Sequence, residues 1–326
     1  MTVHDVARLA GVSAMTVSRV INSADSVATD TVSKVQAAIG KLGYVRNRLA
    51  GGLRSSKSHF VAAIVPALST TVYMETIEAL TRTLSSRGYH LMVGQTGYGE
   101  SGEDDLLFDI ISRRPDAIVL TGTLHSKEGR RRLLASGIPV VETWDLTEYP
   151  IDMLVGFSHE AIGAAVGEHF AASGRKRPAF IGADDLRARR RCGAFERRSE
   201  QLGMTKPLAL LVPAPAKLGD GRRALRSLVE GGSKVDAIFC SSDMLASGVL
   251  LEAKALGLRV PDDLGVMGFA DLNFAQDLDP PLTTVRVDAG RIGQLTADII
   301  VDRLAGKQSA SQVIDVGFSI IGRSSG

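Results

Sequence analysis

Cysteine and tryptophan are scarce in this chain of 326 residues, which has two cysteines and one tryptophan. Cys192 and Cys240 both stand in expected core surroundings, so we expect buried thiols and no disulfide framework. No apolar run is long enough to cross a membrane, and the first residues lack the basic, apolar and small-residue pattern of a secretion signal. These absences favour a disulfide-free cytoplasmic protein with no membrane partner.

Signals for catalysis or cofactor binding are also missing. The six histidines show no metal-ligand spacing, and no Gly-x-Ser-x-Gly elbow is present. The stretch Gly97–Gly102 matches the dinucleotide fingerprint Gly-x-Gly-x-x-Gly, but the three acidic residues 103–105 after it would repel a pyrophosphate. In a chain with 34 glycines, chance explains this match better. We therefore expect no cofactor, no metal and no enzymatic activity.

The net charge is small but unevenly distributed. The whole chain carries a formal charge of +2. Residues 1–57 hold eight Lys and Arg against three Asp and Glu, a net of +5, whereas the remaining residues hold 30 against 33, a net of −3. A basic head on a slightly acidic body indicates that only the head meets a polyanion.

The basic head begins with the pattern of two short helices. Gly11 stands where the chain must turn with a positive φ, and Ser13 is placed to cap the second helix. The expected buried positions are Val6, Ala7, Ala10, Val17, Val20 and Ile21. The residues left outward on the second helix are Ala14, Met15, Thr16, Ser18, Arg19 and Asn22. This pattern favours a helix-turn-helix that enters a DNA major groove, and the alternative is an ordinary helical hairpin inside a larger core.

A third helix and a linker complete the head. The third helix is expected from about Asp30 to Leu42, with Gly43 as its stop, which gives an all-α domain over residues 1–46. Residues 47–58 are basic and polar, and they contain two adjacent glycines that each cost ~1 kcal/mol in a helix. This stretch is interpreted as a linker.

Residues 59–326 show apolar runs that alternate with helical segments. Strands are expected at Val61–Val65, Tyr89–Val93, Ala117–Leu120, Pro139–Glu142, Met153–Val155, Ala179–Ile181, Leu208–Val212, Ala237–Cys240, Leu264–Met267 and Val313–Ile320. Helices between them include Val72–Arg87, Ala161–Ala172 and Met244–Leu256. Continuous apolar strands separated by helices are typical of parallel sheets covered on both faces. So many strands predict two α/β subdomains with a ligand cleft between them, where strand ends and helix starts converge.

Four stretches of the chain point to one family. They are Asp-Val-Ala…Gly-Val-Ser…Thr-Val-Ser-Arg-Val-Ile-Asn at 5–22, Gly-Tyr-Val-Arg-Asn-Arg-Leu-Ala at 43–50, Ser-Ser-Asp-Met-Leu-Ala-Ser-Gly at 241–248, and Gly-Val-Met-Gly-Phe-Ala-Asp…Pro-Pro-Leu-Thr-Thr-Val at 265–285. Over its whole length the sequence resembles the LacI/GalR family of bacterial transcription regulators. The gluconate-repressor branch looks most similar, because a residue other than Asp follows Gly268-Phe269 and Val-Val-Glu stands at 140–142.

The resemblance implies a homodimer on a near-palindromic double-stranded operator and a periplasmic-binding-protein-like core that senses a small-molecule effector. The core would divide into a subdomain of residues 59–157 plus 287–312 and a second of residues 158–286 plus 313–326. No leucine heptads trail the last strand, which favours a dimer over a tetramer. A solute-binding protein or an enzyme built on the same core is the remote alternative.

The resemblance also assigns the DNA contacts. Base reading falls on Ala14, Met15 and Arg19, and phosphate contacts fall on Thr16 and Ser18. For Met15 the alternative is partial burial against the third helix. Ser13, Asn22 and Asn47 also belong to the expected DNA-contacting set.

The linker matches the hinge helix of the family, which inserts a leucine into the minor groove. That leucine falls on Leu53, with Arg54 beside it. Gly51 and Gly52 raise the entropy cost of ordering this hinge. The alternative is a plain flexible linker.

Loops at the expected strand ends supply the effector contacts. Tyr73 and Trp144 stand where they can stack on a small ligand. By resemblance Arg191 is the central effector residue, and Arg187 lies one helical turn earlier on the same face. Two arginines on one face favour a carboxylate or phosphate ligand. Arg189 and Arg190 are expected on the outer, solvated face of this helix.

Two departures from the family sharpen the ligand prediction. Ala270 stands where sugar-binding members of the family have Asp, although Asp271 follows it directly. Members of the family usually have an Asn-Asp pair at 242–243, and here Ser242 replaces the Asn while Asp243 remains. Loss of an anion with retention of arginines favours a sugar acid such as gluconate. One alternative is that the effector is a neutral sugar, and another is that the protein is an activator rather than a repressor. Nothing in the residues shows whether the effector is an inducer or a corepressor.

Overall fold

The computed structural model of the protein describes residues 1–45, 57–69, 71–97, 101–123, 126–307 and 313–326. The chain folds as two compact units, Met1–Ser58 and His59–Gly326. Within the described ranges, no helix is long and apolar enough to span a membrane.

The first unit is a three-helix domain. Its helices are α1 (Val3–Ala10), α2 (Ala14–Asn22) and α3 (Thr29–Leu42), with a short 3-10 turn, η1 (Ala24–Ser26), before α3. Their apolar faces meet in one small core of Val6, Ala7, Val17, Val20, Val35 and Ala38.

Two local signals set the angle between α1 and α2. Gly11 has a φ of +66°, a left-handed conformation in which a β-carbon is disfavoured. The Oγ of Ser13 accepts a hydrogen bond from the backbone N–H of Thr16 at 3.1 Å and so caps α2. The expected turn and cap are both confirmed.

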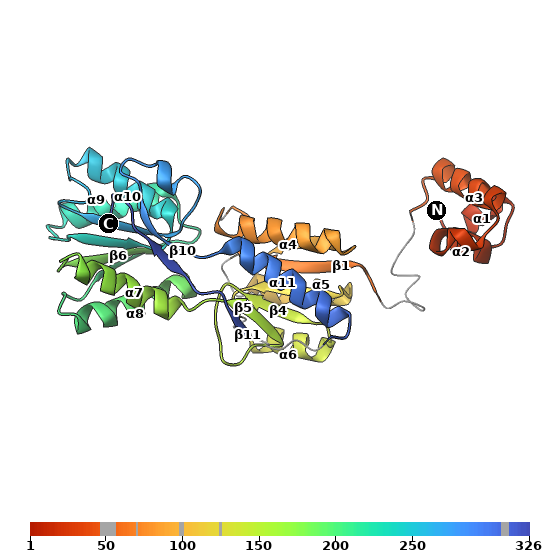
Figure 1. The fold of residues 1–326 in the computed structure, drawn as a ribbon, viewed down its shortest axis with the longest axis horizontal. Helices are drawn as coiled ribbons and strands as arrows, with labels where there is room; N and C mark the ends of the chain where they lie inside the picture. Colours follow the sequence, from red (N-terminus) through yellow and green to blue (C-terminus); the bar gives the residue numbers. More distant parts are fainter. Residues whose placement is uncertain (46–56, 70, 98–100, 124–125, 308–312) are drawn as a thin grey trace. The chain divides into compact units, whose positions relative to one another are not determined.

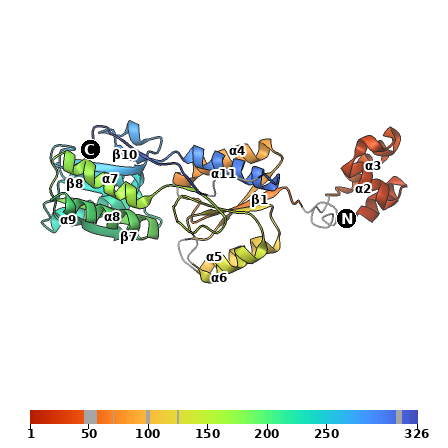
Figure 2. The same cartoon turned by 60° about the horizontal axis from the view of Figure 1, so that its bottom comes forward.

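The second unit contains two six-stranded sheets, and the first has the strand order β11-β5-β4-β3-β1-β2. All of its pairings are parallel. Its strands are β1 (Phe60–Val65), β2 (His90–Gln95), β3 (Ala117–Thr121), β4 (Val140–Thr143), β5 (Met153–Gly156) and β11 (Val313–Asp315). The covering elements are η2 (Thr71–Tyr73), α4 (Met74–Ser86), α5 (Ser101–Ser112), α6 (Lys127–Ser136) and α11 (Ala289–Leu304). Helices α4 and α11 lie together on one face, and α5 and α6 lie on the other (Figures 1 and 2).

The second sheet has the order β12-β10-β9-β8-β6-β7, in which only the pairing of β12 with β10 is antiparallel. Its strands are β6 (Pro178–Ala183), β7 (Leu208–Val212), β8 (Ala237–Cys240), β9 (Gly265–Ala270), β10 (Thr283–Arg286) and β12 (Ser319–Ile321). The helices are α7 (His159–Ala172), α8 (Leu186–Gln201), α9 (Leu218–Glu230), α10 (Asp243–Ala255) and the short η3 (Ala275–Asp277). Helix α7 packs against α8, and α9 packs against α10. The expected pair of α/β subdomains is therefore observed.

The chain passes between the two sheets three times, at residues 157–158, 287–288 and 316–318. Because the strands of each sheet are mostly parallel, the loops after β1, β4, β6 and β8 gather at their carboxyl ends, where α/β proteins bind ligands. These loops form the cleft described below.

Two features of the second unit differ from expectation. The prediction of a single strand over Val313–Ile320 is wrong. The chain turns at Gly317, which has a φ of +67°, and β11 and β12 are therefore separate strands. Since β11 pairs with β5, Val313–Asp315 belongs to the first subdomain instead of the second. Strand β10 was not expected, because buried threonines take the place of an apolar run.

Candidate functional site

The outward face of α2 presents a small polar surface with one large apolar side chain. Met15 is 68% exposed, so it does not pack against α3, and that alternative is wrong. Ser18 and Arg19 are exposed as well, and Arg19 has no ion-pair partner in the part of the chain that the structure describes. Ala14 and Thr16 are half-buried.

Three of the expected DNA-contacting side chains, Ser13, Thr16 and Asn22, form hydrogen bonds within α2 and its N-terminal cap. The hydroxyls of Ser13 and Thr16 lie 2.9 Å apart. The side-chain amide of Asn22, which is also exposed, donates to the backbone oxygen of Ser18 at 2.8 Å. The other members of the set, Asn47, Leu53 and Arg54, lie outside the described residues.

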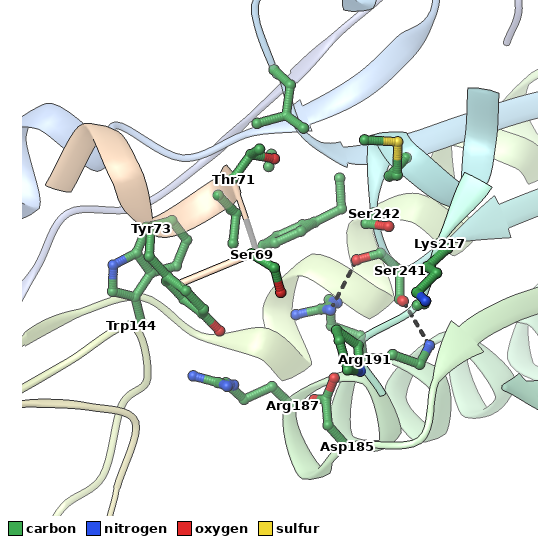
Figure 3. A pocket seen from close by; sticks show the side chains of 18 of the residues that line it. Ser69, Thr71, Tyr73, Trp144, Asp185, Arg187, Arg191, Lys217, Ser241 and Ser242 are labelled. Atoms are coloured by element: carbon green, nitrogen blue, oxygen red, sulfur yellow. Dashed lines mark hydrogen bonds between the residues drawn. The ribbon is translucent and has the colours of Figure 1, made fainter. Parts of the chain in front are cut away.

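A cavity of about 270 Å³ lies in the second unit between the two subdomains. Of the expected effector residues, Tyr73, Trp144, Arg187, Arg191 and Ser242 line it. Figure 3 shows Tyr73 and Trp144 on one side and Lys217, Ser241 and Ser242 on the other, with Arg191 between them. The remaining lining residues are Ser69, Thr71, Val72, His159, Ala183, Asp185, Pro215, Ala216, Leu218, Met244, Phe269, Ala270 and Leu272.

Arg191 is a buried cation at the centre of this cavity. Its guanidinium donates to Nδ1 of His159 at 2.9 Å and to the backbone oxygen of Ser241 at 3.2 Å, and it lies 4.1 Å from the centroid of the Phe269 ring. Among the described residues no carboxylate is hydrogen-bonded to it, and its Nε is buried without a hydrogen-bond partner. Burial lowers the pKa of Arg191 to about 10, so the side chain stays charged at neutral pH.

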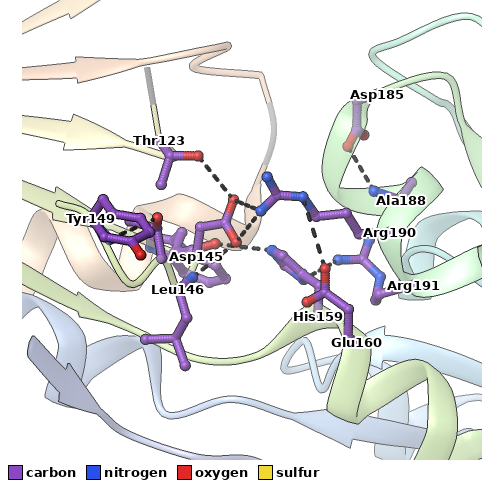
Figure 4. Close-up of polar contacts among 12 residues, drawn as sticks. Thr123, Asp145, Leu146, Tyr149, His159, Glu160, Asp185, Ala188, Arg190 and Arg191 are labelled. Carbon is purple, nitrogen blue, oxygen red and sulfur yellow. Dashed lines mark hydrogen bonds and ion pairs between the residues drawn. The ribbon is translucent and has the colours of Figure 1, made fainter. Parts of the chain in front are cut away.

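His159 links this arginine to the opposite wall. Its Nε2 lies 3.0 Å from the backbone oxygen of Trp144. A carbonyl only accepts hydrogen bonds, so Nε2 carries the proton and the lone pair of Nδ1 accepts from Arg191 (Figure 4). Burial, reinforced by the neighbouring Arg191 charge, holds the pKa of His159 well below its usual range. His159 is therefore a neutral bridge between the two subdomains.

Trp144 and Tyr73 form a rigid aromatic wall. Their rings meet edge to face with centroids 5.1 Å apart, and the indole N–H of Trp144 donates to the Oγ1 of Thr76 at 3.2 Å. Trp144 adopts a φ of +65°, which is uncommon for a bulky residue. The guanidinium of Arg187 lies 5.5 Å from the centroid of the Tyr73 ring. Both aromatic residues are buried, so little of either ring faces solvent.

Two expected effector residues serve the fold instead. The buried carboxylate of Asp243 accepts from the Oγ1 of Thr284 and from the backbone N–H of Leu272, both at 2.6 Å, and burial raises the pKa of Asp243 to about 6. Asp271 is paired with Arg286 at 2.5 Å and with Arg323 at 2.8 Å. Neither aspartate lines the cavity, because each carboxylate is held by its own subdomain. Ser242 lines it while capping α10 through the backbone N–H of Leu245 at 3.3 Å.

The interpretation of Arg190 as a solvated outer-face residue is wrong. Its guanidinium lies 2.8 Å from both carboxylate oxygens of Asp145, which is 2% exposed. Arg189 does lie outward, paired with the exposed Asp184. Helical periodicity could not separate the two, because Asp145 comes from the other subdomain.

Sequence reasoning also missed six polar residues of the cavity: Ser69, Thr71, His159, Asp185, Lys217 and Ser241. Ser158 caps α7 through the backbone N–H of Ala161 at 3.0 Å, and this Ser-His start was available as a signal. Ser241 directly follows β8, where a cleft residue is expected. Asp185 caps α8 by accepting from the backbone N–H of Ala188 at 2.9 Å.

Comparisons with known proteins agree with this architecture. Residues 2–47 match the bacterial regulatory proteins of the lacI family, and residues 167–325 match the periplasmic binding protein-like domain. The chain is 36% identical to the HTH-type transcriptional regulator GntR of Pseudomonas aeruginosa, over 99% of this chain and 95% of that protein.

Solved structures are similar as well. A LacI-family regulator from Silicibacter pomeroyi has a TM-score of 0.93 and 32% identity, over 100% of this chain and 99% of that one. The transcription regulator GntR from Chromobacterium violaceum has a TM-score of 0.78 and 33% identity, over 82% of this chain and 98% of that one. The helix-turn-helix unit, the two-sheet core and these relatives together show that the chain belongs to the LacI family of ligand-responsive, DNA-binding transcriptional regulators.

Proposed function

We propose that this regulator is a cytoplasmic repressor whose effector is a sugar acid such as gluconate. The observation that carries the proposal is the charge of the cavity lining, which contains three basic residues, Arg187, Arg191 and Lys217, and one acidic residue, Asp185. A buried cation is costly unless an anion or good hydrogen-bond acceptors meet it. A carboxylate in the cavity would supply the missing anion for Arg191.

The rest of the lining suits a polyhydroxylated chain. Ser69, Thr71, Ser241 and Ser242 offer hydroxyl groups that both donate and accept hydrogen bonds. The parts of Tyr73 and Trp144 that reach the cavity offer a small apolar surface for carbon-bound hydrogens. A neutral sugar would find these groups too, but it would leave the excess of positive charge unmatched.

The test is a calorimetric titration of the full chain with gluconate, 2-ketogluconate and glucose. We expect an acid to bind and glucose not to bind. Arg191→Ala should weaken acid binding about 10- to 100-fold, which corresponds to ~1.5–3 kcal/mol for hydrogen bonds to a charged group.

Arg189→Ala is the matched control, because Arg189 lies two residues away on the same helix and pairs with the exposed Asp184. It should leave the affinity unchanged. Binding of glucose alone, or equal acid affinity in Arg191→Ala and the unmodified chain, would rule out the sugar-acid proposal.

On the DNA side, the exposed face of α2 supports base reading by Arg19 and an apolar contact from Met15, for example to a thymine methyl. We propose that Thr16, which is half-buried, and Ser18, which is exposed, contact phosphates. Leu53, with Arg54, is proposed to enter the minor groove when the protein binds its operator.

A second copy of the chain is the proposed partner in this complex, since two helix-turn-helix units read two half-sites. The free edge of the first sheet supports this pairing. Strand β2 forms that edge, and its Met92 and Val93 are 57% and 39% exposed. An exposed apolar edge of this kind is normally covered by a partner.

A further inference from the structure

The ion pair of Asp145 and Arg190 joins the two subdomains beside the cleft. Asp145 follows Trp144 in the loop between β4 and β5, and Arg190 lies on α8. The Nη1 of Arg190 is 2.8 Å from each oxygen of the carboxylate (Figure 4). Thr123 adds a hydroxyl contact at 3.4 Å, and the backbone N–H of Leu146 donates to the carboxylate at 2.9 Å.

This carboxylate lies directly behind the cavity wall. It follows the aromatic residue that lines the cavity, and the hollow of about 140 Å³ that it lines shares Asp185 and Arg187 with the cavity. Its side chain is almost fully buried, so water screens its charge poorly. Burial raises the pKa of Asp145 although the charge of Arg190 opposes the shift.

A buried carboxylate at this place would oppose the binding of an acid. Like charges repel over several ångströms in a medium of low polarity. Arg190 makes the hydrogen-bonded ion pair with Asp145, and the charge of Arg187 also acts on this carboxylate. The nearby Glu160, 4.0 Å from Arg190, is about half exposed and is screened by solvent.

We propose that Arg190 determines the selectivity of the cleft for acids without touching the ligand, because it neutralises Asp145 and keeps the cavity positive. Arg190 is thus a positioning and charge-balancing residue for the sugar acid. This inference rests on the proposed acid effector, and it predicts that the charge of Asp145, and not the bridge between subdomains, is what matters for binding.

The test is a double-mutant cycle on the full chain, with gluconate affinity measured by calorimetry. Arg190→Gln should weaken gluconate binding about tenfold or more, because Asp145 loses the cation at 2.8 Å and keeps only the electrostatic influence of Arg187. Asp145→Asn should bind gluconate at least as tightly as the unmodified chain. The double variant should return to within about threefold of the unmodified chain, since both charges are gone.

A purely mechanical bridge gives a different pattern. If the pair only holds the subdomains together, Asp145→Asn weakens binding as much as Arg190→Gln, and the double variant is not restored. That pattern would overturn the inference, and so would unchanged affinity in Arg190→Gln. Arg189→Gln, on the exposed pair with Asp184, is the control and should have no effect.

Failure of this inference is distinct from failure of the proposed function. If Arg191→Ala weakens gluconate binding as expected while Arg190→Gln leaves it unchanged, only the role of Arg190 is wrong. If the unmodified chain binds no sugar acid, both are wrong. Thermal melting of every variant checks that the fold is retained.

Discussion

His159 shows how one buried side chain can connect two halves of a cleft. It donates to the backbone oxygen of Trp144 and accepts from Arg191, so both ring nitrogens are used only while the imidazole is neutral. Protonation would place two cations at hydrogen-bonding distance in a buried site. The conformation of the cleft and the protonation of His159 are therefore linked.

The pH dependence of unfolding should reveal this histidine. The pKa of His159 is lowered in the folded state, so the unfolded state binds the extra proton as the pH falls. The contribution of neutral His159 to the free energy of unfolding is fully present above about pH 6.5, the pKa of a histidine in the unfolded chain. Below that pH the contribution falls by up to about 1.4 kcal/mol per pH unit.

Denaturant unfolding of the full chain between pH 5 and 7.5 measures this effect as the difference between the unmodified chain and His159→Gln. The raised pKa of Asp243, about 6, makes the free energy of unfolding change with pH in the opposite direction. Asp243 is present in both chains, so its effect cancels in the difference. His90→Gln, on the exposed start of β2, is the control. An equal slope in His159→Gln and the unmodified chain would contradict the assignment.

At the scale of helices and strands, apolar patterning predicted most of the core. Nine expected strands are present, some with ends shifted by a few residues, because their apolar runs contrast with polar loops, even in β2 and β7, which have no buried residue. Strand β10 was missed because Thr283 and Thr284 are buried through their hydroxyl contacts with Arg323 and Asp243. Those partners lie about 40 residues away, and local sequence carries no sign of them.

The cleft could be predicted only in part for the same reason. Tyr73, Trp144, Arg187, Arg191 and Ser242 were found from strand ends and family resemblance. Asp243 and Asp271 do not line the cavity, because the groups that neutralise or bind their carboxylates come from β10 and the C-terminal segment. Which carboxylate faces a ligand depends on such long-range pairs.

The packing of α7 on α8 holds Arg191 in place. A β-carbon on Gly163 of α7 would lie 2.2 Å from the backbone oxygen of Arg191 and 2.9 Å from the backbone nitrogen of Phe195. Gly163→Ala should therefore force the helices apart, at a cost of about 1–3 kcal/mol of unfolding free energy. It should also weaken sugar-acid binding, because Arg191 moves with α8.

Gly193 on α8 is the matched control. Its added β-carbon would meet only the flexible end of Arg197, at 3.4 Å. Gly193→Ala should stabilise the protein by up to about 1 kcal/mol, since alanine favours the helix. Equal effects of the two substitutions in chemical denaturation would show that close packing at Gly163 does not matter.

At the scale of the whole molecule, the cleft is built from both subdomains of the second unit, and the chain crosses between them three times. A ligand that contacts both walls must favour one relative position of the subdomains. The first subdomain follows directly in sequence after the DNA-binding unit. An effector that favours one arrangement can therefore alter operator binding, and such coupling is reciprocal.

On the proposed function, one sugar acid and one operator compete through this coupling. The most direct measurement is a calorimetric titration of the full chain with gluconate, with and without a duplex that the protein selects from a random pool. We expect the duplex to weaken gluconate binding about 5- to 150-fold, or ~1–3 kcal/mol, and gluconate to weaken duplex binding by the same factor. Equal gluconate affinity with and without the duplex would contradict it.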